Sequence, residues 1–157
     1  MCSSDLDFLQ FLMTWTIQGL WVSVTLAAGL AAMTADEPKP FGLAGAFGLS
    51  LWVVGFVVEV VADKQKSKFK REHPGEYITG GLWQYSRHPN YLGEIILWVG
   101  ISVLALPVLS GWQYATLISP VFVCFLLIKV SGIRMLEFQA NKRWGKDPAY
   151  QTYRANT

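Results

Sequence analysis

One segment of the chain, Gly80 to Glu94, combines several side chains that can bind ligands and leads directly into a long apolar run. The guanidinium of Arg87 can bind a phosphate or a carboxylate through two parallel hydrogen bonds. The amide of Asn90 can donate and accept hydrogen bonds at once, and Glu94 follows it by four residues. Together these side chains predict a ligand-binding site at the edge of an apolar element.

The aromatic residues of the same segment suggest an alternative. Trp83, Tyr85 and Tyr91 are typical of the belt that aromatic side chains form at a membrane interface. Such a belt accounts fully for Trp83. It does not require a guanidinium, an amide and a carboxylate within eight residues, so we interpret those three groups as a site and keep the belt as the alternative.

A second group of ionisable residues lies upstream. Glu59 and Asp63 are four residues apart and share one face of a helix, and Glu59 lies about one turn inside an apolar run. An ionisable residue at that depth faces a bundle interior or a wet cavity by default; the alternative is an ion pair with a nearby lysine. Five basic residues follow. They indicate a cytoplasmic flank in contact with anionic lipids, and one or two of them can also bind a phosphate: Lys64, Lys66, Lys68, Lys70 and Arg71.

The elements that must position these groups are apolar. The 157-residue chain is 52% hydrophobic and 15% charged, with a mean hydropathy of +0.32. Soluble domains carry about a quarter of charged residues, so this composition argues against a soluble globule, a disordered chain or a disulfide scaffold. The net charge of +2 is too small to indicate a nucleic-acid partner.

Three largely uncharged runs are long enough to cross a bilayer: 8–35, 41–62 and 95–128. The third would be about 51 Å long as one helix, which is too long for a single span. Pro107, Ser110-Gly111 and Pro120 predict that this run is divided. We therefore predict an all-α, polytopic membrane bundle with about four spans, at 8–33, 41–62, 92–109 and 112–130. The alternative replaces the last two spans by one tilted, broken helix.

The basic residues predict the orientation. Of the 13 lysines and arginines, all but Lys39 lie after Asp63 and outside the predicted spans or at their ends. By the positive-inside rule, the segment 63–91 and the tail after Ile128 face the cytoplasm. The Asp36–Pro40 loop and the Ser110-Gly111 turn then face outward.

The first six residues, Met1-Cys2-Ser3-Ser4-Asp5-Leu6, can be written in codons as the end of a common sequencing-library adapter. We interpret residues 1–6 as a scar of sequence assembly, with a genuine polar N-terminus as the alternative. Residues 7–157 then form a single membrane domain whose native start lies upstream. Cys124 remains as a packing residue inside an apolar run, and neither a disulfide nor a metal site is predicted.

Small residues along the second span predict close packing against a neighbouring helix: Gly42, Gly45, Ala46, Gly48 and Gly55. Their spacing is not that of a dinucleotide-binding loop, and the chain has no phosphate-binding loop of the Walker type. If a nucleotide cofactor binds here, a different device must hold it.

The motif Gly81-Leu82-Trp83-x-Tyr85-Ser86-Arg87-His88-Pro89-Asn90-Tyr91-x-Gly93-Glu94 resembles the signature of bacterial steroid 5-alpha-reductase-like membrane proteins, many of them of unknown function. The resemblance extends to Glu59-x-x-x-Asp63-Lys64-Gln65-Lys66 and, in the tail, to Glu137, Trp144, Asp147-Pro148-x-Tyr150 and Tyr153. The wider superfamily includes sterol reductases and isoprenylcysteine carboxyl methyltransferases. The resemblance implies a membrane helical bundle, in the bacterial inner membrane, with a cofactor bound at the cytoplasmic side.

Two parts of the motif point to different cofactors. Arg87-His88-Pro89-x-Tyr91-x-Gly93 is similar to the methyltransferases, which use S-adenosylmethionine, whereas Asn90-Tyr91-x-Gly93-Glu94 is similar to the reductases, which use NADPH. The resemblance implies nine cofactor-binding residues: Asp63, Arg87, His88, Asn90, Tyr91, Glu94, Arg134, Tyr150 and Tyr153. For Arg134, a positive-inside charge is an equal alternative.

One departure from the family concerns catalysis. In steroid 5-alpha-reductases, a Glu and a Tyr that polarise the substrate carbonyl lie on helices before the cofactor-binding half, but residues 8–35 contain no carboxylate, Tyr or Lys. The catalytic residues are therefore unassigned. The expected function is a membrane-embedded, NADPH-dependent reductase of a double bond in a steroid- or lipid-like substrate, surrounded by membrane lipids. The alternatives are an S-adenosylmethionine-dependent methyltransferase and a non-catalytic membrane fragment.

Overall fold

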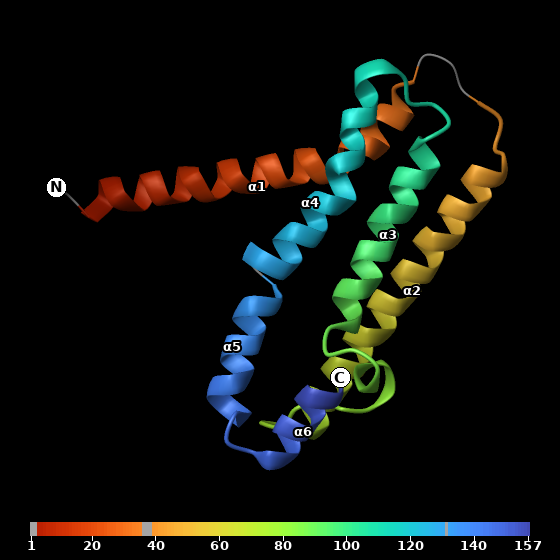
Figure 1. Cartoon of the computed structure of the whole chain (residues 1–157). Helices are drawn as coiled ribbons and strands as arrows, with labels where there is room; N and C mark the ends of the chain where they lie inside the picture. The colour runs from red at the N-terminus through yellow and green to blue at the C-terminus, as the bar shows by residue number, and fades with distance from the viewer. Residues whose placement is uncertain (1–2, 36–38, 131) are drawn as a thin grey trace.

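The computed structural model describes residues 3–35, 39–130 and 132–157, and these residues form helices and connecting turns without a strand (Figure 1). The elements are α1 (Ser3–Met33), α2 (Leu43–Glu72), the 3₁₀ turn η1 (Gly81–Gln84), α3 (Pro89–Ala105), the 3₁₀ segment η2 (Gly111–Ile118), α4 (Ser119–Phe125), the π-helical segment η3 (Leu126–Val130), α5 (Ile133–Trp144) and α6 (Pro148–Asn156). The predicted all-α fold is confirmed. Cys2 of the predicted scar, and part of the Asp36–Pro40 loop, lie outside the described residues.

Three helical stretches are long and apolar enough to cross a membrane: 8–33 of α1, α2, and the path Gly111–Trp144 through η2, α4, η3 and α5. The apolar helix α3 is shorter. Large apolar side chains are exposed along α1, the apolar part of α2 and the path from η2 to α5, whereas those of α3 are mostly half-buried.

Helices α2 and α3 form an antiparallel pair in direct contact, side by side in Figure 1. Gly48 and Gly55 of α2 face Gly100 and Gly93 of α3, and a Cβ atom at any of the four would lie within 3 Å of the opposite backbone. The predicted close packing is thus confirmed for Gly48 and Gly55. The nearest neighbour of Gly45 is the ring of Phe41 on its own chain segment, and Gly42 and Ala46 are exposed.

Helix α2 continues well past the apolar run. The predicted second span ends near residue 62, whereas the helix ends at Glu72. Its last turns consist mainly of lysine, glutamine, arginine and glutamate, which are good helix formers. The helix stops before His73-Pro74, because a proline disfavours the helical conformation of the residue before it. This extension carries the basic residues 64–71 away from the apolar part of the helix.

Helix α3 starts at Pro89, which occupies a first-turn position where its missing N–H group costs nothing. The chain turns between Leu106 and Ser110, and η2 then begins with a capping box in which Ser110 and Gln113 satisfy each other's backbone groups. Helix α4 leads through η3 to α5, which runs back toward the end of α2 where α6 and the C-terminus also lie (Figure 1).

Only the C-terminal half of α1 packs on the other helices. Ala28 meets Ala105 and Leu109 in a small core, and the buried hydroxyl of Ser119 donates to the Thr25 carbonyl oxygen at 2.6 Å. The N-terminal half extends away from the bundle (Figure 1), and its described side chains, 8–20, are exposed. The site described below is therefore built without α1.

Candidate functional site

The loop before α3 is fastened to the polar end of α2. The indole Nε1 of Trp83 donates to the Ala62 carbonyl oxygen at 3.1 Å, and the Leu82 amide donates to Oε1 of Gln65 at 2.9 Å. Trp83 is 4% exposed, and the Lys66 ammonium lies 5.0 Å from its ring centroid, within cation–π range. The Trp83 side chain is thus a buried anchor of the loop, rather than part of an exposed aromatic belt.

The C-terminal segment closes on the same loop from the other side. The Tyr153 hydroxyl donates to the Trp83 carbonyl oxygen at 2.6 Å, and Nε1 of Trp144 donates to the Gly75 carbonyl oxygen at 2.9 Å. Tyr77 packs edge-on against Tyr150, with ring centroids 5.0 Å apart. Aromatic contacts and two good hydrogen bonds therefore join α5 and α6 to the segment between α2 and α3.

Between these walls lies a cleft of about 730 Å³, bounded by α2, the loop 75–88, α5 and α6. Its basic side chains come from three of these elements: Lys66, Lys70, Arg87, Lys142 and Arg143. Its aromatic side chains are Phe69, Tyr77, Trp83, Trp144, Tyr150 and Tyr153. Such a combination suits a ligand that carries both negative charge and flat rings.

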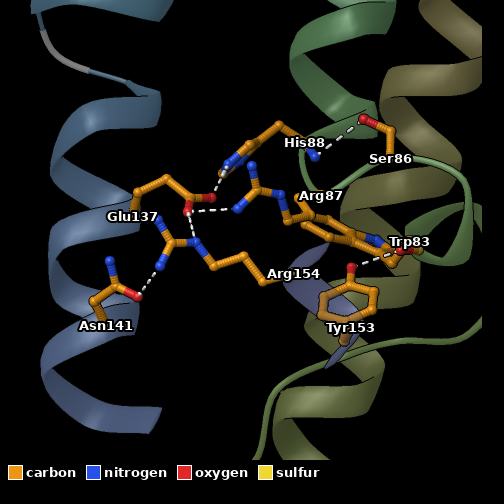
Figure 2. Close-up of polar contacts among 8 residues, drawn as sticks. All are labelled: Trp83, Ser86, Arg87, His88, Glu137, Asn141, Tyr153 and Arg154. Carbon is orange, nitrogen blue, oxygen red and sulfur yellow. Dashed lines mark hydrogen bonds and ion pairs between the residues drawn. The ribbon is translucent and has the colours of Figure 1, made fainter. Parts of the chain in front are cut away.

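Glu137 of α5 lies at the centre of an ion cluster on the cleft wall (Figure 2). Its Oε2 atom is 2.7 Å from Nη1 of Arg87 and 3.8 Å from Nε of Arg154, and its Oε1 atom is 2.9 Å from Nε2 of His88. Arg154 also donates to Oδ1 of Asn141 at 2.9 Å. Arg87 is thus already paired with a carboxylate, whereas the other cleft cations form no ion pair with any described residue.

Burial shifts the pKa values of His88, Tyr150 and Tyr153 in the cleft. It lowers the pKa of the His88 imidazole below its ordinary value, against the opposing effect of the Glu137 carboxylate. His88 is therefore neutral at pH 7, and its Nε2–H donates to Glu137. Burial also raises the pKa of the Tyr150 and Tyr153 phenols, which consequently stay protonated.

The nine residues expected to bind a cofactor fall into three places. Four of them line the cleft: Arg87, His88, Tyr150 and Tyr153. Four others lie on α2 or the first turns of α3 and do not line it: Asp63, Asn90, Tyr91 and Glu94. Arg134 is exposed near the start of α5 and also lies off the cleft. The expected single group of nine is therefore divided by the structure.

The α2–α3 group has its own electrostatic character. Asp63 and Glu94 lie close enough for their like charges to interact, and Glu59 interacts with both. Oδ1 of Asn90 is buried without a hydrogen-bond partner among the described residues. Buried amide oxygens are normally paired, so Asn90 has an acceptor to offer. The described His, Cys, Asp and Glu residues form no group that could hold a metal ion.

Several cleft residues were not among the nine. Lys66 and Lys70 carried a sequence signal, since one or two of the lysines after Asp63 were expected to bind phosphate. Lys142 and Arg143 had none beyond their positive charge, because only the folded chain shows that α5 returns to α2. Glu137 was marked by the resemblance without a role.

The chain matches the family model described as "Protein of unknown function (DUF1295)" over residues 2–157. It is 30% identical over 113 residues to steroid 5-alpha-reductase DET2 of Solanum lycopersicum, which covers 71% of this chain and 39% of that protein. The corresponding protein of Gossypium hirsutum is 42% identical over 59 residues, or 36% of this chain and 23% of that protein. The 3-oxo-5-alpha-steroid 4-dehydrogenase 1 of Bos taurus is 32% identical over 72 residues, or 43% and 27%.

These matches cover between 23% and 39% of the relatives' own lengths. No solved structure matches the chain. The family model covers nearly the whole sequence, and the two plant relatives are steroid 5-alpha-reductases by name, whereas the bovine relative is a steroid dehydrogenase by name. The chain belongs to the DUF1295 family, whose members are homologous to the steroid 5-alpha-reductases.

Proposed function

We propose that the protein is a membrane-embedded, NADPH-dependent reductase of a double bond in a steroid- or lipid-like substrate. The observation that carries this proposal is the cleft in which unpaired cations and aromatic rings line one cavity. Homology to the steroid 5-alpha-reductases supports the reaction class.

The cleft suits a phosphorylated dinucleotide in size and chemistry. Its volume of about 730 Å³ lies within the range of small-molecule sites. Lys66, Lys70 and Arg143 would bind the phosphates, because their charges are not used by described carboxylates. The rings of Trp144 and Tyr150 offer faces for the bases. NADPH, when bound, supplies a hydride for the substrate double bond.

The α2–α3 group would recognise the polar edge of the same cofactor. The unpaired Oδ1 of Asn90 can accept a hydrogen bond from an amide N–H of a ligand. The carboxylates of Asp63 and Glu94 can accept from ribose hydroxyls. Asn90 follows the cleft residue His88 by two positions, which supports the proposal that one cofactor of dinucleotide length contacts both groups.

In this proposal the cleft faces the cytoplasm of a bacterium, and the apolar helices lie in the inner membrane with the C-terminus inside. The cleft lysines and arginines belong to the basic segments that the positive-inside rule assigns to that side. A dissolved cofactor then reaches the cleft from the cytoplasm, and a lipid-like substrate enters from the bilayer.

The test is cofactor binding by the detergent-purified chain. NADPH, NADH and S-adenosylmethionine are titrated in parallel while thermal unfolding is followed. NADPH at 100 times its dissociation constant adds about 2.7 kcal/mol of stability. We expect NADPH to stabilise the wild type more than NADH or S-adenosylmethionine does. The Lys70→Gln variant should show a weaker stabilisation by NADPH, and Lys68→Gln should show the same stabilisation as the wild type. Lys68 is the matched control because it lies on the same helix, off the cleft, paired with Glu72.

Two results would overturn the proposal. Stabilisation by S-adenosylmethionine and not by NADPH would identify a methyltransferase. The absence of any response to the three compounds would identify a chain without a cofactor site. If NADPH binds, its reaction with a model enone is monitored by the loss of absorbance at the nicotinamide band. Such a loss would extend the result from binding to reaction.

A further inference from the structure

A single carboxylate on α5 contacts two other segments, the end of the loop before α3 and helix α6. Arg87 belongs to the loop before α3, His88 immediately precedes α3, and Arg154 lies on α6, yet all three contact Glu137 of α5. Figure 2 shows the three side chains converging on this one residue. Arg87 and Glu137 are 50 residues apart in the chain.

The geometry uses both carboxylate oxygens. Oε1 faces His88, and Oε2 faces Arg87 and Arg154, so rotation of the carboxylate would break at least one contact. The Arg87 and Glu137 side chains are 29% and 18% exposed. Charges that are partly removed from water are destabilising unless they are paired, so this arrangement constrains the positions of its members more than an exposed pair would.

We propose that Glu137 is a positioning residue, which orients Arg87 and His88 along the cleft and holds α5 and α6 in place as its wall. The guanidinium of Arg87 is then held in its ion pair with Glu137. The phosphates are bound by the cleft cations that form no ion pair with a described residue. This last consequence rests on the proposed function, whereas the positioning role does not and is tested without a ligand.

The His88 ring reports on this cluster directly. The charges that face it are the Glu137 carboxylate from α5, the Arg87 guanidinium from the loop and the Lys66 ammonium from α2. From α3, the Tyr91 ring stacks on it with centroids 5.7 Å apart. The Glu137 charge favours the protonated imidazole, and the two cations disfavour it. Removing the Glu137 charge must therefore lower the His88 pKa, and removing the Arg87 charge must raise it.

The experiment is a pH titration of the imidazole signals by NMR, on the full chain in detergent and without ligand. The chain has two histidines, so a His73→Gln variant assigns both signals. We expect Glu137→Gln to lower the His88 pKa and Arg87→Gln to raise it. Glu72→Gln is the matched control, because Glu72 forms an exposed pair with Lys68, and it should leave the His88 pKa unchanged.

The outcomes separate a positioning role from general damage. A Glu137→Gln variant with an unchanged His88 pKa would overturn the proposal. So would shifts of both variants in the same direction, toward a free imidazole, because this would indicate lost packing. If Glu137→Gln does not fold, the upward shift in Arg87→Gln carries the test, and its absence overturns the proposal.

A second arm, NADPH titration of the same variants, keeps the two proposals distinguishable. Opposite His88 shifts with no NADPH binding by the wild type would support the positioning role and reject the proposed function. Wild-type NADPH binding that Glu137→Gln retains at full affinity, together with an unchanged His88 pKa, would support the function and reject the positioning role. We expect the opposite shifts and a several-fold rise in the NADPH dissociation constant of Glu137→Gln.

Discussion

Gly55 of α2 and Gly93 of α3 meet backbone to backbone. A Cβ atom on Gly55 would lie 2.6 Å from the Gly93 carbonyl oxygen, and one on Gly93 would lie 2.7 Å from the Gly55 carbonyl oxygen. Gly48 and Gly100 repeat this relationship two turns away, at 2.9 and 2.8 Å. The spacing of seven residues returns each glycine to the same face of its helix, so the two helices touch along a common line.

Replacement of Gly55 by alanine should destabilise the protein. The atoms that the new methyl group would meet belong to the backbone of α3, which cannot move aside as a side chain can. We expect Gly55→Ala to lower the free energy of unfolding by about 1–3 kcal/mol, the usual cost of overpacking. Gly19→Ala is the control, since nothing lies within 4 Å of that position. Denaturant unfolding in detergent measures both, and equal stabilities would contradict the close contact.

The two adjacent glycines of the loop should respond differently to the same change. Gly81 has a φ angle of +65°, and a Cβ there would lie 2.6 Å from Oε1 of Gln65. Gly80 has an extended backbone and open space around it. We expect Gly81→Ala to cost about 1–2 kcal/mol of stability, mainly through the left-handed conformation, and Gly80→Ala to be nearly neutral. Thermal unfolding decides, and a neutral Gly81→Ala would refute the loop geometry.

The hydroxyl of Tyr153 should contribute to holding α6 against the loop. Tyr153→Phe removes its 2.6 Å hydrogen bond to the Trp83 carbonyl oxygen and keeps the ring. We expect a loss of about 1 kcal/mol and faster proteolysis within α6. Tyr85→Phe is the matched control, because Tyr85 is 79% exposed and no hydrogen bond of its hydroxyl is found among the described residues. Equal proteolysis of both variants would show that the hydrogen bond does not hold α6.

The stability of the protein should fall in mild acid because of His88. Burial lowers the pKa of this ring in the folded state, so the unfolded chain takes up the proton more readily. The resulting stability is complete above the unfolded pKa of about 6.5 and is lost as the pH falls through the lower folded pKa. We expect His88→Gln to lose this part of the pH dependence and His73→Gln to keep it. If the wild type and His88→Gln show the same dependence of unfolding free energy on pH from about pH 7 to 5, His88 is excluded as the cause.

Local patterns predicted the helices better than the site. The predicted third span begins at residue 92, close to the start of α3 at Pro89, and the break near Ser110 was visible from turn residues. The extension of α2 to Glu72 was missed because the apolar pattern ends earlier, although its polar residues favour a helix. Hydropathy identifies the membrane-compatible part of a helix and says little about where a polar continuation ends.

The composition of the cleft depended on tertiary structure. Asn90 and Glu94 are neighbours of Arg87 in sequence, but they lie within α3, whereas Arg87 and His88 precede it and reach the cleft. Residues of one sequence motif therefore do not all line the same cleft. The opposite wall comes from α5 and α6, and no sequence periodicity records that these helices return to α2.

The backbone contact between α2 and α3 also has a mechanical consequence. Where two helices touch through glycines, no side chain lies between their backbones that could repack, so we expect them to move together. The helices α5 and α6 are attached to this unit through side chains, chiefly Glu137, Trp144 and Tyr153. Side-chain contacts can exchange partners within a protein's working timescale. If the cleft opens to admit or release a ligand, we therefore expect α5 and α6 to move relative to the α2–α3 pair.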